Sequence, residues 1–180
     1  MGNAIIGVDL GFKGGITYAR QEPDGTRYHS IVGMPVVMVG KKTQYNTQYI
    51  NDLIVSWSHL AHDGLVAVIE DVWARPGEGV VSSFRFGRGR GIMEGLLTAL
   101  QIPYSYVSPQ KWKKAMGLVK DKDETKAEFK TRSRLLAMEL APEHANSFKR
   151  ASSDGLAESF LLTEYMFSIA DKQLATANTP

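Results

Sequence analysis

Residues 4–19, AIIGVDLGFKGGITYA, decide the fold, because they consist of two apolar runs joined by the glycine-rich segment GFKGG. Apolar runs of this length around glycines are typical of two strands joined by a turn. Side chains alternate along a strand, so Gly7 and Asp9 share the face opposite to Ile6, Val8 and Leu10. A carboxylate in such a strand is unfavourable unless it is paired or bound to a metal. Asp9 is therefore the first candidate site residue.

The chain beyond this pair of strands alternates between strand and helix patterns. Further strands are expected over Tyr28–Gly33, over the apolar run Leu65–Glu70 and within YSYVSP, residues 104–109. Helical spacing of apolar residues predicts helices over 46–62, Ile92–Leu100, Asp123–Leu140 and, after a serine cap at Ser152 or Ser153, the C-terminal part. We expect the PGEG and FGRGRG segments to be loops. This order predicts an α/β fold: a mixed five-stranded sheet, with three antiparallel strands and then helix-linked parallel strands, flanked by helices.

Length and composition fit one domain. A chain of 180 residues with 43% hydrophobic content can bury a central sheet, and we expect a single domain over residues 1–172 with a flexible tail over 173–180. The absence of cysteine excludes disulfides and thiolate metal sites. No secretory signal pattern opens the sequence, and no apolar run reaches the roughly 18–20 residues that span a bilayer. We therefore expect a cytoplasmic protein with no membrane partner.

Positive charge is concentrated in the middle of the chain. The formal net charge is only +2, but Lys111–Arg134 contains nine Lys or Arg and four acidic residues. Such a segment can neutralise phosphates, although a solvated helix face is the commoner reason for a run of charge.

Two further acidic residues can join Asp9. Glu70 ends a later strand, and Asp154 lies in the first turn of the last helix. If the two strands are neighbours and this helix packs across them, the three carboxylates converge. Oxygen ligands of this kind suit Mg²⁺ or Mn²⁺, and two such ions can activate water and stabilise the leaving oxygen of a phosphodiester. Each acid alone could equally be solvated, and Asp154 could simply favour the helix dipole.

An ordered set of motifs covers about residues 5–165: GVDLGFKGGITYA, VIEDVW, FGRGRG, VSPQKWKKAMGL, KDETK and SSDGLAESF. In this order and spacing, the set resembles the RuvC family of Holliday junction resolvases in the RNase H-like superfamily. The resemblance implies an RNase H-like fold, a homodimer, and paired Mg²⁺-dependent nicking of four-way DNA junctions, with two ions that Mn²⁺ can replace. A short chain without cysteine would suit a phage-type member, acting in a bacterial or phage-infected cell.

The resemblance also assigns roles to individual residues. The family's metal-binding and catalytic carboxylates fall on Asp9, Glu70 and Asp154. Ala151 stands where the family usually has another Asp or His. Glu158, one helical turn after Asp154, either replaces that ligand or is a plain solvent-facing residue.

Lysines near the scissile phosphate correspond to Lys111 and Lys126, and we expect Lys126 to stabilise charge on the phosphoryl group. Trp73 falls where the family has an aromatic residue thought to insert at the junction centre, although it could instead be a core or dimer-interface residue. The other expected DNA contacts are Arg75, Arg85, Arg88, Arg90, Lys113, Lys114 and Lys130. The family's dimer contact corresponds to the apolar face of Ile92–Leu100.

Two other functions remain open at this stage. An RNase H-type nuclease would use the same carboxylates on an RNA–DNA hybrid. A non-catalytic junction-binding module would use the basic segment alone and would bind DNA in a salt-sensitive way without cleaving it. A sugar kinase or actin-like ATPase is disfavoured, since 180 residues without a repeat leave no room for a second lobe.

Overall fold

The computed structural model describes residues 3–61, 64–73, 77 and 79–177. A mixed five-stranded sheet has the order β3-β2-β1-β6-β7. Its strands are β1 (Ala4–Asp9), β2 (Gly15–Gln21), β3 (Arg27–Gly33), β6 (Leu65–Glu70) and β7 (Tyr104–Val107). The pairs β1–β2 and β2–β3 are antiparallel, whereas β1–β6 and β6–β7 are parallel. The predicted α/β fold with a mixed sheet is confirmed.

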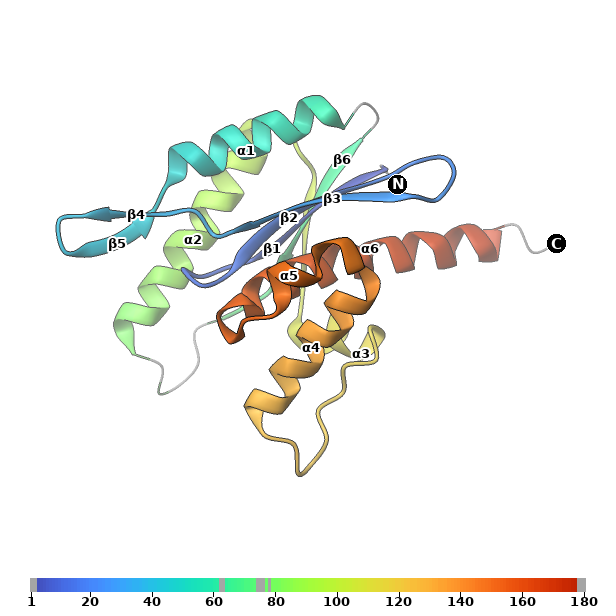
Figure 1. The fold of residues 1–180 in the computed structure, drawn as a ribbon. Coiled ribbons are helices and arrows are strands. Elements are labelled where there is room, and N and C mark those ends of the chain that lie inside the picture. Colours follow the sequence, from blue (N-terminus) through green and yellow to red (C-terminus); the bar gives the residue numbers. More distant parts are fainter. Residues whose placement is uncertain (1–2, 62–63, 74–76, 78, 178–180) are drawn as a thin grey trace.

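Helices cover both faces of this sheet (Figure 1). One face carries α1 (Thr47–Leu60) and α2 (Val80–Ala99). The opposite side holds α3 (Pro109–Ala115), α4 (Lys126–Leu140), α5 (Ala145–Phe148) and α6 (Asp154–Ala177), with the short 3₁₀ turns η1 (Pro142–His144) and η2 (Ala151–Ser153) between them. No helix in the described part of the chain is both long and apolar enough to cross a membrane.

Strand β1 separates two hydrophobic cores, as its alternation predicts. Ile6 and Val8 pack with α1 and α2, whereas Ile5 belongs to the core under α6. Gly7 lies on the α6 face, where an added Cβ would collide with the carbonyl oxygen of Ser159. This glycine therefore allows α6 to lie close against β1, next to the carboxylate of Asp9 at the end of the strand.

A second, two-stranded sheet was not predicted. It is the hairpin of β4 (Val36–Val39) and β5 (Lys42–Tyr45), which projects beyond the central sheet in Figure 1. Val39 pairs with Lys42, so the turn is Gly40–Lys41. The apolar residues of β4 are exposed, and an exposed apolar run lacks the alternation that identifies a half-buried strand.

The FGRGRG segment is helical, which corrects the loop prediction. Helix α2 starts at Val80 and includes all of its glycines. Glycine costs about 1 kcal/mol in a helix relative to alanine, which is why the sequence suggested a loop. Packing overrides this cost, because Gly89 is buried under Tyr45, whose ring would collide with any Cβ at that position.

Three other expectations change at helix ends and faces. Thr125 caps α4 in a capping box with Glu128, so the helix begins later than residue 123. The final helix is preceded by a 3₁₀ turn over Ala151–Ser153 instead of a serine cap, and it continues through residue 177. The apolar side of Ile92–Leu100 packs on the protein's own core through Met93 and Leu97, so this face is not free for a dimer contact.

Candidate active site

Three carboxylates converge where β1 and β6 end. The parallel pairing of Val8 with Ile69 brings the ends of both strands to one edge of the sheet, so Asp9 and Glu70 follow side by side. Glu158 joins them from α6, and one carboxylate oxygen from each of these residues lies within 4.8 Å of the others. Oxygen atoms gathered in this way suit a divalent cation such as Mg²⁺. Of the two readings of Glu158, the structure therefore supports the one that puts it in the carboxylate group.

The electrostatics of this group also fit a cation. Burial raises the pKa of Asp9 well above its usual value, and the neighbouring carboxylates of Glu70 and Glu158 raise it further. Lys113 and Lys130 act in the opposite direction but do not cancel these effects. Ionisation of Asp9 is therefore opposed by burial and by the two neighbouring carboxylates, which is the condition that a bound divalent cation relieves.

Helix α3 supplies two residues that position these carboxylates, and sequence reasoning gave neither of them this role. Glu70 is buried, and its Oε1 accepts a hydrogen bond of 3.0 Å from Nε1 of Trp112, which is fully buried. Lys113 was expected to contact DNA, but its Nζ lies 3.0 Å from Oε1 of Glu158 and 4.0 Å from Oε1 of Glu70. Its ammonium group thus lies among the carboxylates, where a metal ion would also bind. Trp112 stands between lysines in QKWKKA, and this pattern could have indicated that the helix buries its tryptophan.

Asp154 stands beside this group and is not part of it. Its Oδ2 accepts a hydrogen bond of 2.8 Å from Lys130, and its Oδ1 accepts one of 2.5 Å from Arg134. The bond to Asp154 raises the pKa of Lys130. Both cations come from α4, so Asp154 ties α6 to the basic helix. No role for Arg134 was predicted from the sequence.

An open cleft of about 880 Å³ contains all four acidic residues. The cations that line it come from four different segments of the chain: Lys13, Arg85, Lys113, Lys126 and Lys130. Ala151 also lines the cleft and contributes no carboxylate. A phosphodiester entering this cleft would meet positive side chains around a carboxylate centre.

Trp73 lies on the surface, at the end of β6 beyond Glu70. It is 67% exposed, which excludes the core alternative considered for it. The guanidinium of Arg90 lies 4.5 Å from the centre of its ring. Arg90 was expected to contact DNA, but it donates hydrogen bonds to Asp71 at 2.9 Å and to Glu94 at 3.0 Å. Arg90 therefore supports Trp73 and the strand end from within the protein.

The remaining expected DNA contacts are distributed over the surface. Arg88 is exposed and donates a hydrogen bond of 3.2 Å to Gln44 in β5. Lys111 and Lys114 are exposed on α3 and do not line the cleft. Arg75 lies outside the described residues.

Solved structures of RuvC and of a mitochondrial Holliday junction resolvase have a similar fold. Thermus thermophilus RuvC in complex with a Holliday junction substrate matches with a TM-score of 0.57 and 12% identity, over 92% of this chain and 96% of that one. The chain has a RuvC-like fold. A second structure of Thermus thermophilus RuvC matches with a TM-score of 0.53 and 14% identity, over 92% of this chain and 96% of that one.

The yeast mitochondrial Holliday junction resolvase has the same RuvC-like fold, with a TM-score of 0.51 and 17% identity over 89% of this chain and 76% of that one. No family model and no curated protein sequence matches the chain. At these identities the likeness establishes an α/β fold of the RNase H-like type, and the function has to be argued from the site.

Proposed function

We propose that this protein is a metal-dependent endonuclease that resolves four-way DNA junctions by paired nicks. The observation that carries the proposal is the convergence of Asp9, Glu70 and Glu158 within 4.8 Å, in a cleft lined by cations, on a RuvC-like fold. Carboxylates weaken DNA binding unless a cation offsets them, so three of them in a basic cleft favour catalysis over binding alone.

The residues of the site would have different roles in metal binding and in stabilising charge. Asp9, Glu70 and Glu158 would hold a Mg²⁺ ion, for which Mn²⁺ can substitute, and Trp112 fixes the orientation of Glu70. When bound, the metal would activate water and stabilise the leaving 3′-oxygen. Lys126 is exposed in the cleft and would place positive charge beside the phosphoryl group.

We propose that Asp154 serves a second ion. Its carboxylate is paired with Lys130, whose side chain is 38% exposed at the cleft. DNA offers Lys130 a phosphate in place of this carboxylate. Asp154 would then be available as a ligand while Arg134, only 11% exposed, keeps it in position.

We propose that Trp73 stacks on a base at the junction centre. It is exposed, and the guanidinium of Arg90 lies against its ring. Arg85 and the lysines of α3 and α4 would contact the DNA backbone, which makes binding depend strongly on salt. Aromatic stacking tolerates any base, so these contacts suit a protein that recognises the shape of a junction.

Paired nicks require two active sites, and we propose a homodimer formed by the exposed side of α2. That side carries the exposed apolar residues Val80, Val81 and Phe84. Along the same side lie three exposed glycines, Gly87, Gly91 and Gly95, at which an added Cβ would meet open space. Small residues spaced by four allow two helices to approach closely.

The test uses purified protein with three end-labelled substrates: a four-way DNA junction, the matched linear duplex and an RNA–DNA hybrid. We expect symmetric nicks in the junction with Mg²⁺ and no cleavage with EDTA. Cleavage of the hybrid in preference to the junction would instead establish an RNase H-type nuclease. Junction binding without cleavage in Mg²⁺ or Mn²⁺ would refute the proposed nuclease activity and would indicate a non-catalytic junction-binding module.

A further inference from the structure

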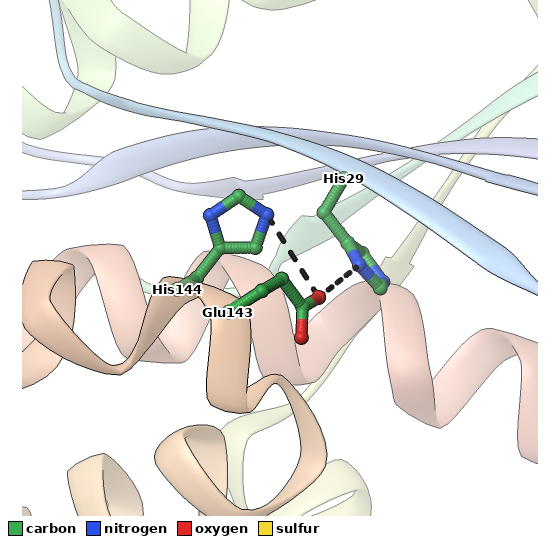
Figure 2. A group of neighbouring side chains, drawn as sticks. All are labelled: His29, Glu143 and His144. Carbon is green, nitrogen blue, oxygen red and sulfur yellow. Dashed lines mark ion pairs between the residues drawn. The ribbon is translucent and has the colours of Figure 1, made fainter.

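A second group of metal-ligand side chains lies at the edge of the sheet and includes none of the residues of the candidate active site. His29 comes from β3, and Glu143 and His144 come from η1, which follows α4. One ligand atom from each residue lies within 4.8 Å of the others. Figure 2 shows the carboxylate of Glu143 between the two imidazole rings.

One atom in this group has no partner within the described residues. The side chain of His29 is only 4% exposed, and its Nε2 lies 2.9 Å from Oε1 of Glu164. A carboxylate can only accept, so Nε2 donates this hydrogen bond, and in the neutral form of the ring Nδ1 then carries the lone pair. Nδ1 is buried without a hydrogen bond and lies 3.9 Å from Oε1 of Glu143, which is another acceptor. Two acceptors that face each other in this way are complementary to a cation between them.

The side of His29 away from this group is built like the outer shell of a metal site. Glu164 in α6, which orients the ring through Nε2, is itself fixed by Arg27 at 2.7 Å. A carboxylate that holds the second nitrogen of a histidine is the usual support of a metal-bound imidazole, because it fixes both the tautomer and the ring orientation. The ring also packs against Phe160, with 4.9 Å between the ring centres.

We propose that His29, Glu143 and His144 bind one zinc-like transition-metal ion, with Nδ1 of His29 as the buried ligand. Two imidazole nitrogens and one carboxylate oxygen match the ligands that Zn²⁺ prefers, whereas Mg²⁺ prefers oxygen alone. The site therefore differs in metal preference from the all-carboxylate group at Asp9.

The position of the site indicates a structural role. It joins the edge strand β3 to the turn that follows α4, the helix whose Lys130 and Arg134 hold Asp154. A metal bridge there would fix the α4–α5 segment to the sheet and would raise the melting temperature without taking part in DNA cleavage.

Zinc titration by calorimetry in excess Mg²⁺ tests the proposal, since Mg²⁺ occupies the oxygen-only group. We expect one Zn²⁺ per wild-type chain and the same result for the Asp9→Asn variant. Glu143→Gln and His144→Ala change partly exposed side chains, so they should fold, and each should weaken Zn²⁺ binding by about tenfold or more. His59→Ala, at an exposed histidine in α1, is the matched control and should bind as wild type does.

X-ray absorption at the zinc edge should show imidazole nitrogen ligands in wild type and fewer of them in His144→Ala. Zn²⁺ should also raise the melting temperature of wild type, and at the same Zn²⁺ concentration it should raise that of His144→Ala by less. The proposal fails if Zn²⁺ does not bind in excess Mg²⁺, if the two variants bind it as tightly as wild type, or if Asp9→Asn alone abolishes the site. None of these outcomes depends on junction cleavage.

Discussion

The indole N–H of Trp112 donates a hydrogen bond of 3.0 Å to Oε1 of Glu70. Both residues are buried, and they come from different elements, α3 and the end of β6. The bond fixes which way the Glu70 carboxylate faces, and Lys113 on the same short helix reaches Glu158. Helix α3 therefore orients carboxylates from two other elements without itself contributing one.

We expect Trp112→Phe to retain junction binding and to cleave roughly 10–150-fold more slowly. The substitution removes a hydrogen bond to a charged group, worth about 1.5–3 kcal/mol, and preserves most of the packing. Single-turnover cleavage and a gel-shift assay measure the two effects separately. Trp57→Phe, at a buried tryptophan on the opposite face of the sheet, is the control and should cleave at the wild-type rate. Equal losses in both variants would show that Trp112 acts only through stability.

Lys113→Gln should bind Mg²⁺ more tightly than wild type. In the free protein the ammonium group is 3.0 Å from Glu158 and 4.0 Å from Glu70, so it competes with a metal ion for these carboxylates. Loss of an ion-pair energy of about 1 kcal/mol corresponds to roughly fivefold in affinity. Calorimetric titration with Mg²⁺ measures the change, with Lys114→Gln as the control at the neighbouring exposed lysine. Weaker Mg²⁺ binding by Lys113→Gln would contradict this account.

Asp9→Asn should stabilise the metal-free protein at neutral pH. The pKa of Asp9 is raised in the folded state, by burial first and by Glu70 and Glu158 next, so the folded state holds the proton to a higher pH than the unfolded chain. The free energy of unfolding therefore falls as pH rises from the pKa of an unfolded Asp, about 3.9, through the raised pKa of the folded state. Asparagine does not ionise, so the variant does not lose this stability. Urea unfolding in EDTA between pH 4 and pH 8 measures it.

In Mg²⁺ at pH 8, wild type should instead be more stable than Asp9→Asn, because only the complete carboxylate group of wild type binds the ion in the folded state. A metal-free Asp9→Asn protein that is less stable than wild type at pH 8 would show that the ionised Asp9 is stabilised by its surroundings.

Trp73→Ala should weaken junction binding roughly 5–150-fold, because base stacking contributes about 1–3 kcal/mol. The side chain is 67% exposed, so the free energy of unfolding should change by no more than about 0.5 kcal/mol. Fluorescence anisotropy with a labelled junction and with linear duplex measures the effect, which should be larger for the junction. Tyr49→Ala, at an exposed aromatic residue of α1, is the control. An equal loss on both DNAs would mean that Trp73 contacts only the backbone.

Much of the central fold was predictable because strand alternation and helical spacing are local patterns. Alternation in β1 correctly placed Ile6 and Val8 on one face and Gly7 on the other, against which α6 packs in the structure. The start of α2 was missed because its helical state depends on burial of Gly89 under Tyr45, which lies 44 residues earlier in the chain. The hairpin β4–β5 was missed because its apolar residues are exposed.

The acidic residues of the site were predictable from the sequence, but the side chains that hold them in place were less so. The order of strands and helices places Asp9 and Glu70 together, and helical spacing makes Glu158 available to them. Nothing local to the sequence shows that Lys130 and Arg134 hold Asp154, or that Trp112 holds Glu70, because these contacts depend on how α3 and α4 pack.

We propose that the carboxylates of Asp9, Glu70 and Glu158 form the catalytic metal site. Single-turnover cleavage of a four-way junction in Mg²⁺ by Glu158→Gln tests it most directly, with Glu139→Gln as the control at an exposed glutamate of α4. We predict that Glu158→Gln loses about 100-fold or more in rate and binds the junction as wild type does, whereas Glu139→Gln is unaffected. Wild-type cleavage by Glu158→Gln would contradict the assignment of this third carboxylate.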